Sequence, residues 1–315
     1  MLRIIRQNLS TPLTLPDAHT MTPDEYCQDK AAKSGSSFYY SFLFLPEAQR
    51  KAITALYAFC REVDDVVDEC HDASVAQSKL NWWRAEIFGT FDGKPHHPVC
   101  QALAPAIAQF NLAKEHFLEI IDGMEMDLQQ TRYANFSELS LYCYRVASVV
   151  GLMAAEIFGY QDRATLKYAH NLGLAFQLTN ILRDIREDAQ RGRIYLPLDE
   201  LAQFGVSEQD ILQGQCSDSM RQLLDFQAQR AAEFYHKAFD FLPETDRYSQ
   251  RTGLIMAGIY QTALAMIAID SCQVLERRVS LSPIRKLWLA WRTARTEKRR
   301  HKKQLHLARP NQQHS

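Results

Sequence analysis

Apolar residues recur at the three- and four-residue spacing of helices along most of this chain. Runs of alternating Val, Ile and Thr, which would indicate strands, are few, and the 315 residues contain only 12 glycines. The periodicity predicts an all-α protein. The expected helices, separated by Gly and Pro, are 47–69, 74–90, 99–111, 114–130, 136–158, 163–188, 218–241, 250–277 and 283–303. Another helix is expected to begin at Thr22-Pro23-Asp24-Glu25, because Thr is a good N-cap and Glu follows three residues later.

The chain is expected to form one domain over residues 21–296, because no linker, repeat or change of composition divides it before about residue 280. Residues 1–20 lack the continuous apolar stretch of a signal peptide, and we interpret them as a disordered, dispensable extension. The longest apolar stretch, 146–158, is shorter than the roughly 20 residues that span a bilayer. A cytoplasmic, soluble protein is therefore expected.

Charge is unevenly distributed along the chain. The formal net charge is -1, but residues 276–315 contain twelve Lys or Arg and two acidic residues, so the preceding 275 residues carry a net charge of -11. Binding to nucleic acid is not expected from so acidic a body, because it requires a broad positive face. The seven cysteines stand singly, without a CxxC pair. We therefore expect neither a disulfide framework nor a zinc site. We do expect a reducing compartment.

An acidic stripe lies on the predicted helix 47–69. Asp64 and Asp68 are one turn apart on the same face, and Tyr57 and Arg61 extend that face toward the N-terminus. Taken alone, the stripe is also compatible with an acidic turn on a solvated surface.

A second polar stripe follows more than a hundred residues later. Asn180, Asp184 and Asp188 repeat the four-residue step, and Gln177 lies about one turn ahead of them. The preceding residues, 172–176, are mostly apolar, so this helix is expected to be buried, where unpaired polar groups cost several kcal/mol. The stripe therefore either pairs with basic residues or holds a metal ion. The candidate basic partners are Arg183, Arg186 and Arg193.

Two such stripes facing each other across a helical bundle would form a cage of oxygen ligands. Carboxylate and amide oxygens without nearby His or Cys favour Mg²⁺, which takes its other ligands from water and substrate phosphates; Mn²⁺ can substitute. We predict that a diphosphate and its metal ions bind there. The predicted metal ligands are Asp64, Asp68, Asn180, Asp184 and Asp188, and the four aspartates among them are the predicted catalytic residues.

These segments resemble the squalene/phytoene synthase family. Tyr57–Asp68 is similar to its first aspartate motif, and Gln177–Asp188 followed by Gly192-Arg-Ile-Tyr-Leu-Pro197 is similar to its second. Tyr142-Cys-Tyr-Arg-Val-Ala-Ser-Val-Val-Gly151 resembles the helix between them, and Ser34-Gly-Ser-Ser-Phe38 resembles its substrate-diphosphate loop. The similarity runs from about residue 23 to 296. The segments SGSSFYYSFLFLP, IIDGMEMDL and PIRKLWLAWRT are most similar to the bacterial presqualene diphosphate synthases of hopanoid biosynthesis.

The resemblance implies a single-domain helical bundle of the type I isoprenoid synthase kind, with a central cavity. It also implies Mg²⁺-dependent head-to-head condensation of two farnesyl diphosphates to presqualene diphosphate, with release of diphosphate. The substrate contacts that it implies are Ser34, Gly35, Ser36, Ser37, Tyr57, Arg61, Tyr142, Gln177, Arg183, Arg193, Tyr260 and Arg278. Ser148 and Arg186 depart from the family pattern. Ser148 lies on a helix that is expected to line the prenyl channel, and Arg186 is expected to add charge near the metals. Phe42 and Phe44 are candidates for the cavity wall.

Several alternatives remain open. A phytoene synthase would use geranylgeranyl diphosphate, and a squalene synthase would complete the reaction with NADPH. NADPH is not expected, because no GxGxxG or P-loop is present. A chain-elongating prenyltransferase usually has two DDxxD motifs, whereas the second stripe begins with Asn180. A non-catalytic binder of nucleic acid or membranes through the basic tail is disfavoured by the acidic body.

The basic C-terminal segment, 285–303, contains Trp288 and Trp291. One hypothesis is peripheral contact with anionic lipid at the inner face of the membrane. The other, which we favour, is a last helix packed through Leu287 and the two tryptophans, followed by a solvated basic tail at 297–315.

Overall fold

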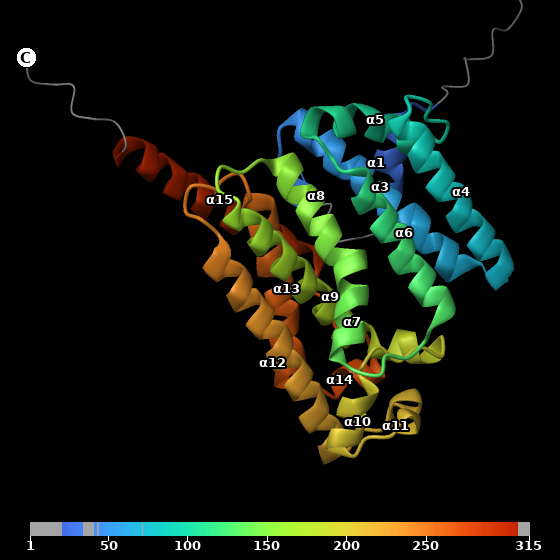
Figure 1. The fold of residues 1–315 in the computed structure, drawn as a ribbon. Helices are drawn as coiled ribbons and strands as arrows, with labels where there is room; N and C mark the ends of the chain where they lie inside the picture. Colours follow the sequence, from blue (N-terminus) through green and yellow to red (C-terminus); the bar gives the residue numbers. More distant parts are fainter. Residues whose placement is uncertain (1–20, 34–40, 43, 71, 308–315) are drawn as a thin grey trace, which may run out of the picture.

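The computed structural model describes residues 21–33, 41–42, 44–70 and 72–307. Within these ranges it contains helices and no strand, which confirms the predicted all-α class (Figure 1). The helices are α1 (Pro23–Lys33), α3 (Glu47–Glu69), α4 (Ala73–Phe91), α5 (Pro98–Phe110), α6 (Lys114–Gln129), α7 (Phe136–Cys143), the π-helix η1 (Tyr144–Ser148), α8 (Val149–Phe158), α9 (Ala164–Gln190), α10 (Leu198–Phe204), α11 (Glu208–Gln213), α12 (Asp218–Phe241), α13 (Arg251–Ile269), α14 (Gln273–Glu276) and α15 (Pro283–Leu307).

The predicted helix start at Thr22 is present as a capping box. The Thr22 backbone N–H donates to Glu25 Oε2 at 2.8 Å, and the Glu25 N–H donates back to Thr22 Oγ1 at 3.3 Å. Two short helices, α10 and α11, were not predicted, because seven and six residues are too few to show a helical period. The helix predicted over 250–277 is interrupted between Ile269 and Gln273.

Helix α9 lies at the centre of the fold and packs against α7, α8, α12, α13 and α14. Its contact with η1 is a close approach of backbones, because a Cβ added at Gly173 would lie 2.6 Å from the Cα of Ser148. Ser148 is fully buried there, and its hydroxyl donates to the His170 carbonyl at 2.9 Å. The Ser148 side chain therefore belongs to the contact between two helices and does not line the cavity described below, although Val146 of the same π-helix does.

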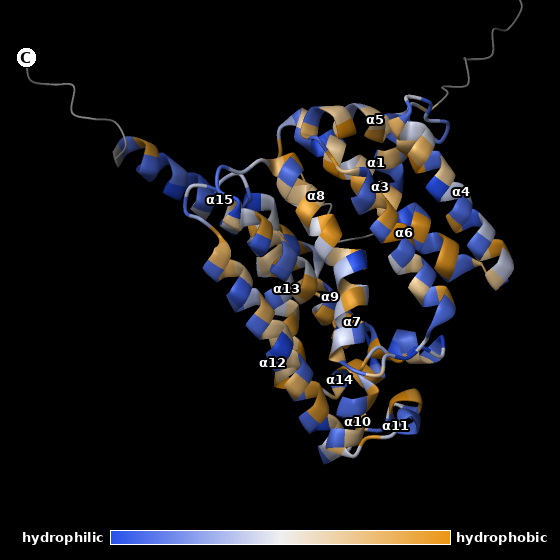
Figure 2. Cartoon of the chain, viewed as in Figure 1, coloured by the Kyte–Doolittle hydropathy of each residue, from blue (hydrophilic) through white to orange (hydrophobic). Residues whose placement is uncertain are grey.

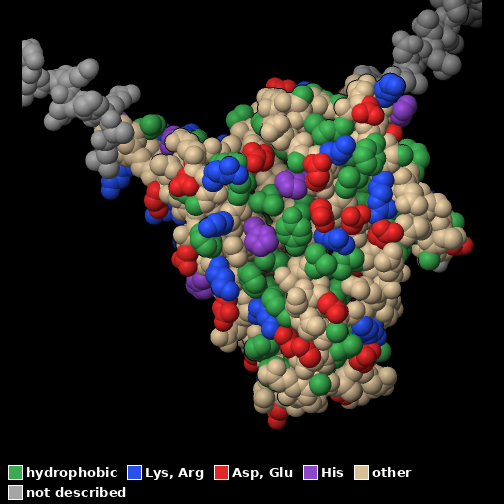
Figure 3. All heavy atoms as spheres, in the orientation of Figure 1, with side chains coloured by type: hydrophobic (Ala, Val, Ile, Leu, Met, Phe, Trp, Pro, Cys, Tyr) green, Lys and Arg blue, Asp and Glu red, His purple; other side chains and the backbone are tan. Residues whose placement is uncertain are grey.

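Two apolar clusters form the core. One is built mainly by α7, α9, α12 and α13, the other by α3, α4, α5, α6 and α8, and Val146 packs against both. In Figure 2 the elongated helices carry apolar and polar residues in alternating bands, as expected for amphipathic helices. On the face shown in Figure 3, Lys and Arg are interspersed with Asp and Glu.

Two helical stretches, 136–158 and Arg251–Ile269, are long and apolar enough to cross a membrane by length and composition alone. Both also supply core residues, such as Met153 and Ile255, which are fully buried within the bundle. Core helices of soluble proteins satisfy the same criterion, so this finding is weak evidence for a membrane span.

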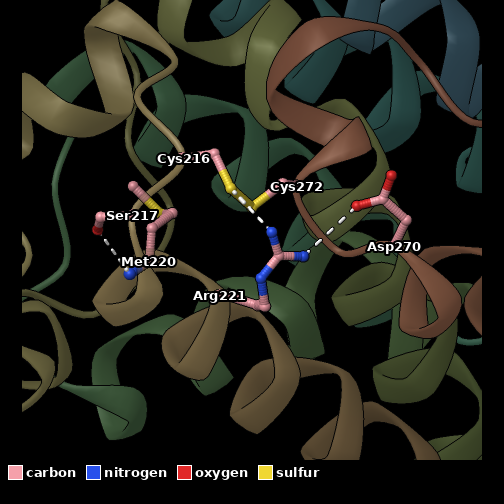
Figure 4. The surroundings of a disulfide bond; sticks show 6 residues. All are labelled: Cys216, Ser217, Met220, Arg221, Asp270 and Cys272. Atoms are coloured by element: carbon pink, nitrogen blue, oxygen red, sulfur yellow. Dashed lines mark hydrogen bonds and ion pairs between the residues drawn. A yellow bond between two sulfur atoms is a disulfide. The ribbon is translucent and has the colours of Figure 1, made fainter.

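A disulfide that the sequence analysis did not predict joins Cys216, before α12, to Cys272, before α14 (Figure 4). Arg221 on α12 strengthens the same connection: its Nη2 lies 3.5 Å from Cys216 Sγ and its Nη1 lies 3.6 Å from an oxygen of Asp270. The other five cysteines are free. The start of the segment between α13 and α15 is thus attached to the start of α12.

Helix α15 packs against α13 and does not end at residue 297, where we placed the start of a solvated tail. Glu297 is buried and accepts from Arg247 at 2.9 Å, and the helix continues to Leu307. The last turns of α15 extend beyond the rest of the fold in Figure 1. The extension at 1–20 and the residues after 307 lie outside the described residues.

Candidate active site

A cavity of about 730 Å³ lies between α3, α6, α7, η1, α9 and α13, and the segments 191–195 and 278–286 complete its lining. This volume is typical of a small-molecule site. Every predicted site residue that the structure describes lines the cavity: Tyr57, Arg61, Asp64, Asp68, Tyr142, Gln177, Asn180, Arg183, Asp184, Asp188, Arg193, Tyr260 and Arg278. The predicted contacts at Ser34, Gly35, Ser36 and Ser37 lie outside the described residues. The two polar stripes therefore face one space.

The first stripe, here called the α3 ridge, consists of Asp64 and Asp68. Asp64 accepts from Arg61 Nη1 at 2.5 Å, one turn earlier on the same helix. Asp68 accepts from Arg191 at 2.9 Å and from Arg193 at 3.2 Å, both of which follow α9 in the chain. The ridge is thus connected to the segment that follows α9.

Asp65, the other half of the aspartate doublet, does not line the cavity. One of its carboxylate oxygens accepts from Arg61 at 2.7 Å, and the other pairs with Lys30 of α1 at 2.8 Å. Consecutive residues on a helix point about 100° apart, so only one member of the doublet can face the cavity directly. Asp65 instead holds Arg61 in place and ties α1 to α3.

The second stripe, the α9 ridge, consists of Asn180, Asp184 and Asp188. Asp184 is held by Arg183 at 2.6 and 2.8 Å and by Arg278 at 2.8 Å. The amide nitrogen of Asn180 donates to Gln177 at 3.3 Å, whereas its Oδ1 is buried without a hydrogen-bond partner. A buried amide oxygen without a hydrogen-bond partner, one turn from a carboxylate, is a candidate metal ligand.

The pKa values of two ridge carboxylates are raised, so their charged forms are disfavoured. Burial raises the pKa of Asp64 to about 6, opposed by Arg61 and reinforced by Asp68. Burial also raises the pKa of Asp188 to about 7, and the nearby charge of Asp184 adds to the shift. Both shifts indicate that burial disfavours the charged form of these carboxylates, which added positive charge would offset.

The donor set fits a hard divalent cation. Aspartate carboxylates and the free amide oxygen of Asn180 are the ligand types that Mg²⁺ prefers, and the raised carboxylate pKa values would be relieved by added positive charge. Among the described residues, no three His, Cys, Asp or Glu side chains already converge on a point that could hold a metal ion. The aspartates that line the cavity are instead paired largely with arginines, so binding a cation would require these pairs to rearrange.

Basic side chains surround the ridges. The predicted ones are Arg61, Arg183, Arg193 and Arg278, and the structure adds Arg191 and Lys286, which the sequence analysis missed. The guanidinium of Arg183 lies 6.0 Å from the ring centroid of Tyr260, which holds it over the cavity. Arg186 faces elsewhere and donates to the Leu275 carbonyl at 2.9 Å. The expectation that Arg186 adds charge near the metals is therefore wrong.

Asp127 of α6 was missed by the sequence analysis. It accepts from the hydroxyls of Tyr142 at 2.8 Å and Tyr195 at 2.9 Å, whose rings stack with centroids 5.2 Å apart. Burial raises the pKa of Asp127 to about 6. A signal was available: Ile120, Met124 and Asp127 follow the i, i+4, i+7 spacing of one helix face, so a carboxylate occupies an otherwise apolar stripe.

The cavity lining also includes a set of largely apolar side chains, here called the apolar wall. They are Tyr57, Cys60, Ile120, Met124, Val146, Ile181, Val279, Leu281, Ile259 and Ala263. Phe42, a candidate for this wall, instead packs edge-on against Tyr57 from outside the lining, and Phe44 packs against the core. The cavity therefore combines an apolar wall with a charged region that contains both aspartate ridges.

The comparisons with known proteins agree with this geometry. A family model for squalene/phytoene synthase matches residues 31–285. Phytoene synthase 2, chloroplastic, of Solanum lycopersicum is 37% identical over 267 residues, which cover 83% of this chain and 86% of that protein. Phytoene synthase of Arthrospira platensis is 40% identical over 240 residues, which cover 72% of this chain and 76% of that protein. The chain belongs to the squalene/phytoene synthase family.

Solved structures show the same relationship. A dehydrosqualene synthase superposes with a TM-score of 0.77 and 28% identity, covering 88% of this chain and 97% of that one. Squalene synthase HpnC from Alicyclobacillus acidocaldarius superposes with a TM-score of 0.70 and 27% identity, covering 81% and 95%. The fold is of the isoprenoid synthase type, and the chain is a prenyltransferase-type enzyme.

Proposed function

We propose that the enzyme condenses two molecules of farnesyl diphosphate head to head, producing presqualene diphosphate and releasing diphosphate. The observation that carries this proposal is that two acidic ridges and several arginines line one cavity together with apolar side chains such as Ile120, Met124 and Val146. A diphosphate bearing a long hydrocarbon chain matches both parts: its charge fits the ridges and arginines, and its chain fits the apolar wall.

The charged region would act on the leaving diphosphate. Arg61 and Arg183 are placed to donate charge-assisted hydrogen bonds to phosphate oxygens, once these displace the aspartates that the two arginines now hold. Mg²⁺ held by Asp64, Asp68, Asn180, Asp184 and Asp188, or Mn²⁺ in its place, would neutralise the charge that develops as diphosphate departs. The arginines and aspartates together then favour ionisation of one allylic C–O bond.

The apolar wall would protect the resulting carbocation from water. The 2,3 double bond of the second farnesyl diphosphate attacks the cation, and loss of a proton closes the cyclopropane ring. The departed diphosphate accepts that proton, since Arg61 and Arg183 keep it beside the reaction centre. Aliphatic side chains such as Ile120, Met124 and Val146 offer no nucleophile to intercept the cation.

The main alternative is phytoene synthase, which uses geranylgeranyl diphosphate. The named relatives described above are phytoene synthases, which favours that substrate, whereas the two superposed structures are named for squalene and dehydrosqualene, which favours the farnesyl chain. The segments that resemble presqualene diphosphate synthases lead us to prefer farnesyl diphosphate. We further propose a cytoplasmic enzyme that does not use NADPH.

Product analysis tests the choice directly. Purified protein is incubated with Mg²⁺ and farnesyl diphosphate, geranylgeranyl diphosphate or an equal mixture, each with and without NADPH. Presqualene diphosphate from the farnesyl substrate, unchanged by NADPH, is the expected product. Phytoene or its diphosphate precursor as the dominant product of the mixture would establish the alternative, and squalene formed only with NADPH would establish a reductive synthase.

A further inference from the structure

Helix α15 exposes an apolar face that the sequence analysis expected to be packed. Ile284 is 81% exposed, and Trp288 and Trp291 are each 50% exposed. Together with Leu287, which is also exposed, they follow the i, i+3, i+4, i+7 spacing of one helix face. The helix packs on the fold through the opposite side, where Ala290 and Glu297 are buried. The favoured hypothesis that the two tryptophans pack the last helix is therefore wrong.

The same face becomes basic toward the C-terminus. The steps of three and four residues continue from Trp291 to Arg295, Lys298 and Lys302, all of which are exposed. Over its 25 residues α15 contains nine Lys or Arg and a single acid, the buried Glu297. The Arg292 and Arg295 guanidiniums lie over the rings of Trp288 and Trp291, at 5.2 and 5.1 Å from their centroids. Figure 3 shows a mixed distribution of charge on the face viewed, which contrasts with this helix.

The exposed apolar area extends to the neighbouring helix. Arg285 Nη1 lies 3.8 Å from Met266 Sδ, so the end of α13 lies beside the first turn of α15. Ile269, three residues after Met266, is 86% exposed. The first turn of α15 also connects to the cavity, because Lys286 lines it together with the residues just before the helix, Val279 to Leu281.

We propose that this face, formed by Ile269, Ile284, Leu287, Trp288, Trp291, Arg295, Lys298 and Lys302, docks on the surface of an anionic lipid bilayer. Tryptophan and aliphatic side chains enter the boundary between headgroups and acyl chains, and basic side chains bind the anionic headgroups. A symmetric dimer through the same face is a poorer fit, because it would bring two helices that each carry a large positive charge together. The proposal does not depend on the proposed condensation, since it concerns a surface outside the cavity.

Binding to vesicles tests the proposal without any measurement of turnover. The full-length protein is sedimented with vesicles of phosphatidylcholine alone or with one third phosphatidylglycerol, at low and high salt. We expect binding to the anionic vesicles only, weakening as salt is raised. Arg295→Glu with Lys298→Glu should weaken it by more than about twentyfold, because each basic group near such a surface contributes about 1 kcal/mol, or about fivefold.

The apolar contribution is tested with a matched pair of variants. Trp288→Ala with Trp291→Ala should reduce binding at least tenfold, whereas Trp82→Ala, which removes a tryptophan of similar exposure (47%) on α4, should leave it unchanged. Circular dichroism checks that each variant is folded. Equal binding by the wild type and the double tryptophan variant overturns the proposal, as does an absence of binding to anionic vesicles. A vesicle-free dimer that the double variant dissociates would assign the face to a second copy of the chain instead.

Discussion

The α3 ridge and the α9 ridge face the same cavity but are held in different ways. Asp64 on α3 takes its arginine from its own helix, and Asp65 beside it points out of the cavity toward Lys30. On α9, Asn180 has an oxygen without a partner, and Asp184 is held both by Arg183 of its own helix and by Arg278 from far along the chain. Position relative to the cavity, and not charge alone, therefore distinguishes the residues that we propose to act on substrate from the residues that support them.

The largest expected effect is a difference in kcat between substitutions at Asp64 and at Asp65, the two members of the aspartate doublet on α3. Asp64→Asn should lower kcat about 10²–10⁴-fold, because it removes a charge from the site where the diphosphate leaves; Asp184→Asn should do the same on α9. Asp65→Asn is the matched control and should cost less than about tenfold, since Asp65 acts only through Arg61 and Lys30. Initial rates at saturating substrate and Mg²⁺ measure both. Similar losses in the Asp64 and Asp65 variants would contradict the distinction.

A second effect is expected at Asn180 of α9, whose side-chain oxygen has no hydrogen-bond partner. Asn180→Leu should lower kcat about 10²-fold, the scale of losing one stabilising group. The same substitution should keep or raise the free energy of unfolding without metal, because a buried oxygen without a hydrogen bond costs about 1–3 kcal/mol. Denaturant unfolding in EDTA and turnover in Mg²⁺ measure the two quantities. A stable Asn180→Leu enzyme with unchanged turnover would remove Asn180 from the ligand set.

The sequence predicts the long helices and both ridges because each is a local pattern. The period of apolar residues marks 47–69 and 218–241 to the residue, and the four-residue step fixes Asp184 and Asp188 on one face of α9. The pattern does not by itself place that face at a cavity, since a polar stripe on a buried helix can be satisfied by basic partners or by a metal ion, and Asp184 is paired with Arg183 and Arg278.

Features that join distant residues could not be predicted in the same way. Asp127 accepts a hydrogen bond from Tyr195, which is 68 residues away in the sequence, and Cys216 forms a disulfide with Cys272, which is 56 residues away. Such pairs depend on how helices pack, which a single sequence does not show. The error at α15 has a different cause: apolar spacing identifies a face of the helix, but it does not tell which of two faces meets the protein.

The smallest expected effect concerns the part of the α9 ridge that depends on a distant segment. The Cys216–Cys272 disulfide anchors the segment that carries Arg278, which in turn holds Asp184. Cys272→Ser should raise KM a few-fold at nearly constant kcat, because Arg278 is positioned less firmly. It should also lower the free energy of unfolding by up to about 4 kcal/mol, the chain-entropy value for a loop of this length.

Reduction of the wild type with dithiothreitol should reproduce both changes and leave Cys272→Ser unaffected. Cys70→Ser, at a free and partly exposed cysteine, is the matched control and should behave like the wild type. The comparison requires protein purified without reductant. Seven titratable thiols in that protein after denaturation would show that the bond does not form, and then packing alone would hold Arg278 against Asp184, which Arg183 of the same helix also pairs with.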